Sequence, residues 1–90
     1  MSDRYEVIVK VISQKGTCVA NMKVGDKWTV AKHTPGGLCM SAYNAIYPNI
    51  RVLMFSGSLP WEKDPDMTTM ACPDAANPVV FELRRGKKIS

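Results

Sequence analysis

The stretch YEVIVKVIS, residues 5–13, decides the fold of this 90-residue chain. Val7, Val9 and Val11 recur with a period of two, as on one face of a β-strand, and Tyr5 shares their face. The residues between them are mixed in polarity, which is typical of an antiparallel or mixed sheet with one well-covered side. We therefore predict a strand here that opens a small sheet.

Other segments of the chain repeat the strand pattern or show helical spacing. The strand pattern recurs over residues 27–31, 67–72 and 79–85. Apolar residues at helical spacing follow Leu38, and again over 49–55, with Gly57 as the C-cap. Because proline is tolerated in a first turn, we interpret Pro48 as the start of the second helix. The order β-β-α-α-β-β predicts an α+β fold, with about four mixed or antiparallel strands covered on one face by two short helices.

Length and charge indicate one small domain over residues 1–90. A domain of this size buries only about 60% of its unfolded surface, so we expect help from a metal or from a homo-oligomer. The net charge of +4 is partly due to residues 85–90, which we expect to form a flexible basic tail. No apolar leader and no membrane-spanning stretch is visible, so we expect a cytoplasmic protein without a membrane partner.

The chain has three cysteines, each beside a turn former. Cys18 follows Gly16, Cys39 follows a Gly-Gly pair, and Cys72 precedes a proline. A reducing compartment and an odd count disfavour disulfides. If the loops converge, three thiolates would bind zinc or an iron–sulfur cluster, with His33 as the fourth group. No C-x-x-C pair is present, and each cysteine taken alone is more typical of a small buried residue.

Cys39 also supports a second hypothesis, a metal-free thiol enzyme or redox sensor. In the first turn of a helix, a thiol is favoured in its reactive thiolate form. Gly36 and Gly37 lack Cβ atoms, so a ligand could approach the backbone N–H groups before the helix. Trp61, in a proline-rich loop, could stack on such a ligand, although tryptophans in loops more often anchor them to the core.

The third hypothesis is an interaction module that binds through the basic C-terminal residues. Arg84, Arg85, Lys87 and Lys88 would attract phosphates or acidic partners. We expect no nucleic-acid partner, because basic and aromatic residues are not interleaved along the chain.

Several motifs together resemble a family of small, mostly uncharacterised prokaryotic proteins of about this length. They cover nearly the whole chain: K-G-x-C at 15–18, K-x-G-D at 23–26, T-P-G-G-x-C at 34–39, Y-P at 47–48, L-P-W at 59–61, C-P-D at 72–74 and V-x-F-x-L-R at 79–84. That family has no settled activity, so the resemblance implies no mechanism. Its members often carry Gly-His shortly after the first cysteine, where this chain has Asn21-Met22.

Overall fold

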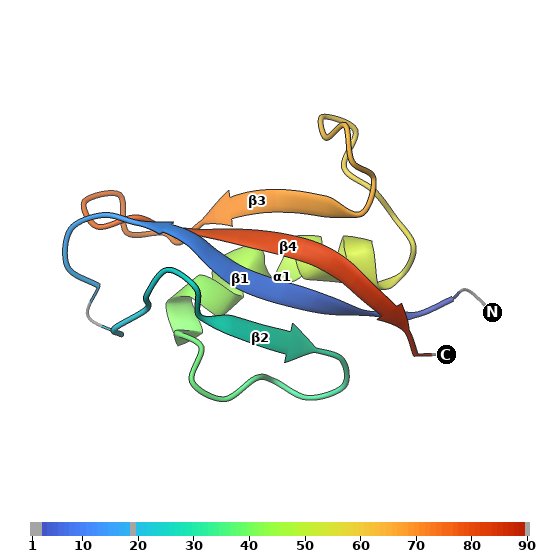
Figure 1. Cartoon of the computed structure of the whole chain (residues 1–90), viewed down its shortest axis with the longest axis horizontal. Coiled ribbons are helices and arrows are strands. Elements are labelled where there is room, and N and C mark those ends of the chain that lie inside the picture. Colours follow the sequence, from blue (N-terminus) through green and yellow to red (C-terminus); the bar gives the residue numbers. More distant parts are fainter. Residues whose placement is uncertain (1–2, 19, 90) are drawn as a thin grey trace.

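The computed structural model describes residues 3–18 and 20–89 and contains four strands and one helix (Figure 1). The elements follow the order β-β-α-β-β. They are β1 (Tyr5–Gln14), β2 (Lys27–Val30), α1 (Met40–Met54), β3 (Met67–Ala71) and β4 (Val79–Lys88). The predicted α+β class and the four strands are confirmed, whereas the two short helices are replaced by a single helix.

The four strands form one sheet in the order β2-β1-β4-β3, with every neighbouring pair antiparallel. The long strands β1 and β4 make the centre, where Val9 pairs with Leu83 and Val11 with Phe81. This register puts the valine face of β1 beside the apolar face of β4. The alternation read from residues 5–13 is therefore sufficient to say which side of the sheet is covered.

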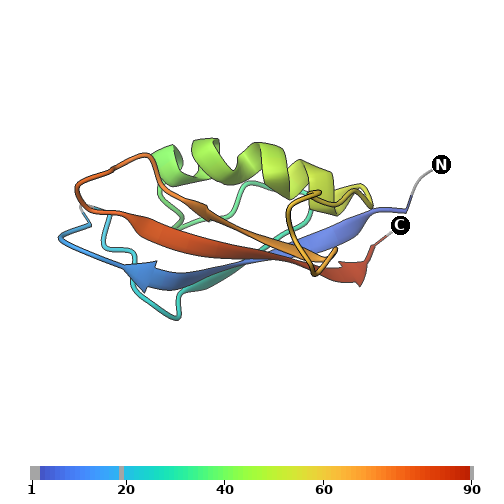
Figure 2. The same cartoon turned by 90° about the horizontal axis from the view of Figure 1, so that it is seen from above.

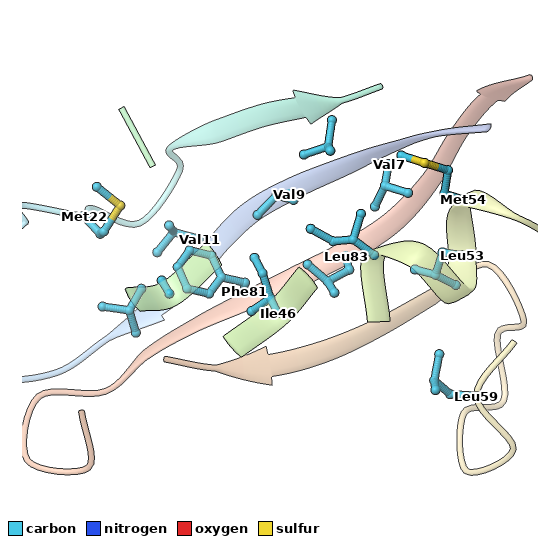
Figure 3. Close-up of a cluster of buried hydrophobic side chains, with 14 residues drawn as sticks. Val7, Val9, Val11, Met22, Ile46, Leu53, Met54, Leu59, Phe81 and Leu83 are labelled. Atoms are coloured by element: carbon cyan, nitrogen blue, oxygen red, sulfur yellow. The ribbon is translucent and has the colours of Figure 1, made fainter. Parts of the chain in front are cut away.

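Helix α1 lies across one face of the sheet (Figure 2). Val7, Val9 and Val11 are fully buried beneath it, as are Phe81 and Leu83 of β4. The helix contributes Ile46 and Leu53 to the same cluster (Figure 3). The core is thus a single layer of side chains between one helix and one sheet face.

The prediction that Pro48 begins a second helix is wrong, because α1 runs through it. Ala42, Ile46 and Ile50 are all buried, so the apolar stripe continues past the proline. Pro48 lies on the exposed side, and so does Asn44, whose carbonyl loses its usual N–H partner. Water can hydrate that carbonyl, and burial of the stripe outweighs the missing hydrogen bond.

The helix ends at Met54, and its C-cap lies two residues before the predicted cap, Gly57. Phe55 is the C-cap residue, and Ser56 takes the left-handed conformation with φ 69°. The Gly57 N–H donates to the Val52 carbonyl (2.8 Å) and the Ser56 N–H to the Leu53 carbonyl (3.4 Å), the two bonds of a Schellman motif. A Cβ on Gly57 would press against Val52, so the glycine is needed for close approach.

The expected flexible tail is a strand as far as Lys88, because residues 85–88 continue β4 beside the start of β1. Arg84 pairs with Asp64 and Glu82, and Lys88 pairs with Asp3. Arg85 is nearly buried and bonds to backbone carbonyls. Most of the basic charge that suggested an acidic partner is therefore engaged within the fold. No helix in the described part of the chain is long and apolar enough to cross a bilayer.

Candidate thiol site

All three cysteines line one pocket, which we call the cysteine pocket, with a volume of about 170 Å³. Cys18 comes from the segment after β1, Cys39 precedes α1, and Cys72 follows β3. These three chain positions meet at the same end of the sheet (Figure 1). Each side chain is partly buried, and the three thiols are free. The antiparallel topology thus joins residues that are more than twenty positions apart in the sequence.

Backbone N–H groups point at two of the three sulfur atoms. The Met22 N–H donates to Cys18 Sγ at 3.5 Å, and the Val79 N–H donates to Cys72 Sγ at 3.3 Å. The turn at Cys18 is closed by the Asn21 N–H, which donates to the Cys18 carbonyl, with Asn21 at φ 62°. N–H donors of this kind favour a negatively charged sulfur, whether free or bound to a metal.

Cys39 occupies the N-cap position of α1. Its carbonyl accepts the Tyr43 N–H at 2.9 Å, which starts the helix. Its side chain caps none of the first N–H groups in the described structure, and the first turn of α1 has no acidic residue. The positive end of a fifteen-residue helix therefore lies next to this thiol. The prediction that Cys39 adjoins a helix N-terminus is confirmed, although the helix starts at Met40 rather than Leu38.

Asn77 ties together two of the cysteine-bearing segments, and the sequence analysis missed it. Its side-chain carbonyl oxygen accepts the Thr17 N–H at 2.9 Å, next to Cys18. Its own backbone N–H and side-chain amide bond to Asp74, in the loop after Cys72. Gly16 has φ 70°, and a Cβ there would overlap with the Asn77 amide. The proline-flanked loop containing Asn77 was the only sequence signal that could have marked it.

The remaining walls of the cysteine pocket are mostly apolar. Met22, Ala42, Val79 and Phe81 separate it from the core, and all four are buried. Asp74 is the one carboxylate that lines it, but both of its oxygens accept hydrogen bonds from its own loop. Sulfur in apolar surroundings is therefore the main chemical character of this pocket.

Other residues predicted for the site lie elsewhere. His33 is exposed and lines a different hollow, beside Tyr43 and Tyr47. Gly36 is open to solvent, and Gly37 lies next to the indole of Trp28 with φ 83°. Trp61 is 69% exposed. The predicted fourth ligand and the predicted glycine and tryptophan contacts are thus separate from the cysteines. His33 lies apart because the chain over 31–39 runs back along β2 before α1 begins (Figure 1).

The cysteines are not arranged as a finished metal site. Within residues 3–18 and 20–89, no three histidine, cysteine or acidic side chains are grouped closely enough to hold a metal ion. A ligand bridging all three cysteines would have to draw the loops inward.

No family model, no curated protein and no solved structure matches this chain.

Proposed function

We propose that this protein binds a soft metal, either zinc or an iron–sulfur cluster, through Cys18, Cys39 and Cys72. The observation that carries the proposal is that all three cysteines of the chain line a single pocket. Thiolate sulfur is the preferred ligand of zinc and of iron–sulfur clusters. The N–H groups aimed at Cys18 and Cys72 support the same chemistry, since they stabilise negative charge on sulfur.

The size of the pocket bears on what is bound. The sulfur atoms line the pocket, and its volume of about 170 Å³ is more than a single bound ion fills. The spare room suits a cluster, or an ion that keeps an open position for water or for a ligand from outside. In a reducing cytoplasm the three thiols would stay available for this role.

Binding would close the pocket. The segment after β1 and the loop after β3 carry Cys18 and Cys72, and Asn77 holds them as a pair. Moving this pair toward Cys39 would bring the sulfur atoms within bonding distance of one centre. Since metal binding of this kind is linked to folding, the bound form should be more stable than the free form.

The test is anaerobic purification followed by elemental analysis and a visible spectrum. We expect zinc or iron in a fixed ratio to the chain, and charge-transfer absorption if iron and sulfide are present. One metal centre per two chains would indicate a homo-oligomer that shares it. Protein without stoichiometric metal, which also fails to bind added Co²⁺ with thiolate absorption bands, would overturn the proposal.

Single variants identify the ligands. Cys18→Ser, Cys39→Ser and Cys72→Ser should each abolish the Co²⁺ bands or shift them strongly, because each removes one sulfur. Ser41→Ala is the matched control, since Ser41 lines the same pocket without a soft donor. Retention of the bands in all three serine variants would exclude the cysteines as ligands.

A second candidate function, metal-free thiol chemistry at Cys39, is favoured by its N-cap position at α1. The Cys39 side chain lies beside the N-terminus of α1 and lines a pocket that a small electrophile could enter. Alkylation of metal-free protein at mildly acidic pH should label Cys39 faster than Cys18 and Cys72. Equal, slow labelling of the three thiols would remove this candidate.

A further inference from the structure

A second hollow, which we call the cationic hollow, lies between the segment that follows β2 and one side of α1. It has a volume of about 140 Å³ and is distinct from the cysteine pocket. Its chemistry comes from six residues: Arg4, Lys32, His33, Tyr43, Tyr47 and Arg51. Among the described residues that line it, none is Asp or Glu. Three positively charged side chains, those of Arg4, Lys32 and Arg51, thus line one small hollow without a described carboxylate among them.

Arg4, which lines this hollow, has an unsatisfied donor. Its Nη2 donates to the Ala31 carbonyl at 2.6 Å, which holds the guanidinium against the segment after β2. Its Nε is buried and has no hydrogen-bond partner among the described residues. Buried polar groups are nearly always paired, and an unpaired charged donor is especially costly. A negatively charged acceptor would pair most strongly with this guanidinium group.

Arg51 and the two tyrosines form the opposite wall. Arg51 Nη1 donates to the Tyr47 hydroxyl at 3.3 Å, and its guanidinium lies 4.7 Å from the centre of the Phe55 ring. No described carboxylate forms an ion pair with Arg51. The rings of Tyr43 and Tyr47 are 5.4 Å apart. Burial, and then the neighbouring Tyr47, raise the pKa of Tyr43, so its hydroxyl stays protonated and can donate.

We infer that the cationic hollow binds a phosphate group, either inorganic phosphate or the phosphate of a small monoester. Guanidinium groups match the geometry of phosphate oxygens, and each bond is strengthened by charge on both partners. A carboxylate carries a single charge, whereas a phosphate near neutral pH carries up to two and can face Arg4, Arg51 and Lys32 together. The tyrosine pair beside them offers a surface for the organic part of a monoester.

The test is an NMR titration of the ¹⁵N-labelled metal-free protein with inorganic phosphate, phenyl phosphate and acetate at constant ionic strength. We expect a saturable shift of the Arg4 Nε–H signal with phosphate and none with acetate. Tighter binding of phenyl phosphate would identify a monoester as the preferred ligand, and equal binding would identify free phosphate. The absence of a saturable Arg4 shift with either phosphate would overturn the inference.

Three charge-removing variants separate a specific site from general attraction. Arg51→Gln and Lys32→Gln should each raise the dissociation constant for phosphate about tenfold, which corresponds to the loss of one charged contact. Both residues are exposed, so the fold should persist. Arg84→Gln removes the same charge from a residue that does not line the hollow and should leave the constant unchanged. Equal weakening in all three variants would show that only net charge attracts the ion.

Discussion

The two ends of the sheet differ in what their polar groups are bonded to. At one end, which we call the cysteine end, Cys18, Cys39 and Cys72 open into a pocket. At the other, the arginine end, Arg85 fills the space between β4, the end of α1 and the loop before β3. Its guanidinium donates to the carbonyls of Leu53, Gly57 and Pro65 and pairs with Asp66 at 3.1 Å.

The comparison distinguishes polar groups that are bonded within the fold from polar groups that remain available to a ligand. The Arg85 guanidinium group donates four hydrogen bonds to protein acceptors, and the side chain is only 10% exposed. Little of its bonding capacity is left for a ligand. The cysteine sulfurs have at most weak N–H contacts and are open to the pocket, so their bonding capacity is largely unused. The same contrast distinguishes Arg85 from Arg4, whose Nε lacks a partner.

The largest effect is expected at the arginine end, from Arg85→Met. The substitution keeps an apolar stem but removes the donor from two half-buried carbonyls, of Leu53 and Gly57, and from the exposed carbonyl of Pro65. Loss of one partner from a buried charged network should lower the free energy of unfolding by about 3 kcal/mol. Urea unfolding followed by circular dichroism measures it.

The adjacent residue provides the control for that experiment. Arg84 is 46% exposed, and its ion pairs with Asp64 and Glu82 lie on the surface. Arg84→Met should therefore change the free energy of unfolding by no more than about 0.5 kcal/mol. Equal losses for Arg84→Met and Arg85→Met would mean that the carbonyl bonds of Arg85 contribute little.

The next effect is expected at the cysteine end, from Gly16→Ala. Gly16 has φ 70°, and a methyl group would collide with the Asn77 side chain. The strained backbone and the collision together should lower the free energy of unfolding by about 2 kcal/mol. Gly25→Ala measures the backbone strain alone, because Gly25 has φ 98° but no neighbour within 4 Å. This substitution should lower the free energy of unfolding by about 1 kcal/mol.

Gly36→Ala completes the glycine series as the unstrained member. It has open space around it and is not among the described residues with positive φ. We expect the free energy of unfolding to change by no more than about 0.5 kcal/mol in either direction. Thermal or urea unfolding of the three variants should rank them Gly16, Gly25, Gly36. Any other order would contradict the role given to Asn77.

A smaller loss, about 1 kcal/mol, is expected for Asn77→Ala, which removes the bond to the Thr17 N–H. The variant should also free the segment that carries Cys18. Alkylation of Cys18 should then be faster than in the unsubstituted protein, with Cys39 little changed. Unchanged Cys18 labelling would show that this segment is held by other contacts.

The smallest effect concerns pH and the surface of the arginine end. The Asp66 N–H, and then the Arg84 guanidinium, lower the pKa of Asp64 below its ordinary value of 3.8. A depressed folded-state pKa contributes stability that is present above the unfolded value and lost as pH falls through the folded one. Stability curves of the protein and of Asp64→Asn should thus differ slightly near neutral pH and converge in strong acid. If the difference in stability between the protein and Asp64→Asn instead grew as the pH fell, the prediction would be wrong.

Sequence patterns predicted the elements well where burial alone specifies them. The period-two residues of β1 and β4 are the fully buried ones, because one sheet face meets the helix and the other does not. Pro48 misled the helix prediction, since a local rule about proline cannot weigh a buried stripe that continues on both sides of it. The tail prediction failed for a similar reason, because the positive charge of Arg85 gave no sign of its carbonyl partners.

The prediction of the site was uneven in the same way. Turn formers beside each cysteine correctly indicated loops, and the three loops converge at one end of the sheet. His33, only six residues before Cys39, lines a different hollow, because the chain between them runs back along β2 to the start of α1 (Figure 1). Asn77 had no motif at all, since its role depends on a partner sixty residues away.

The sequence by itself determined which residues are buried and where the chain turns, because side-chain periodicity and glycine or proline conformations are local properties. Only the tertiary structure decided which distant groups meet. The antiparallel order of the strands brings the three cysteines into one pocket and leaves His33 outside it. It also surrounds Arg85 with acceptors while leaving Arg4 Nε with none among the described residues, since hydrogen-bond partners are set by packing.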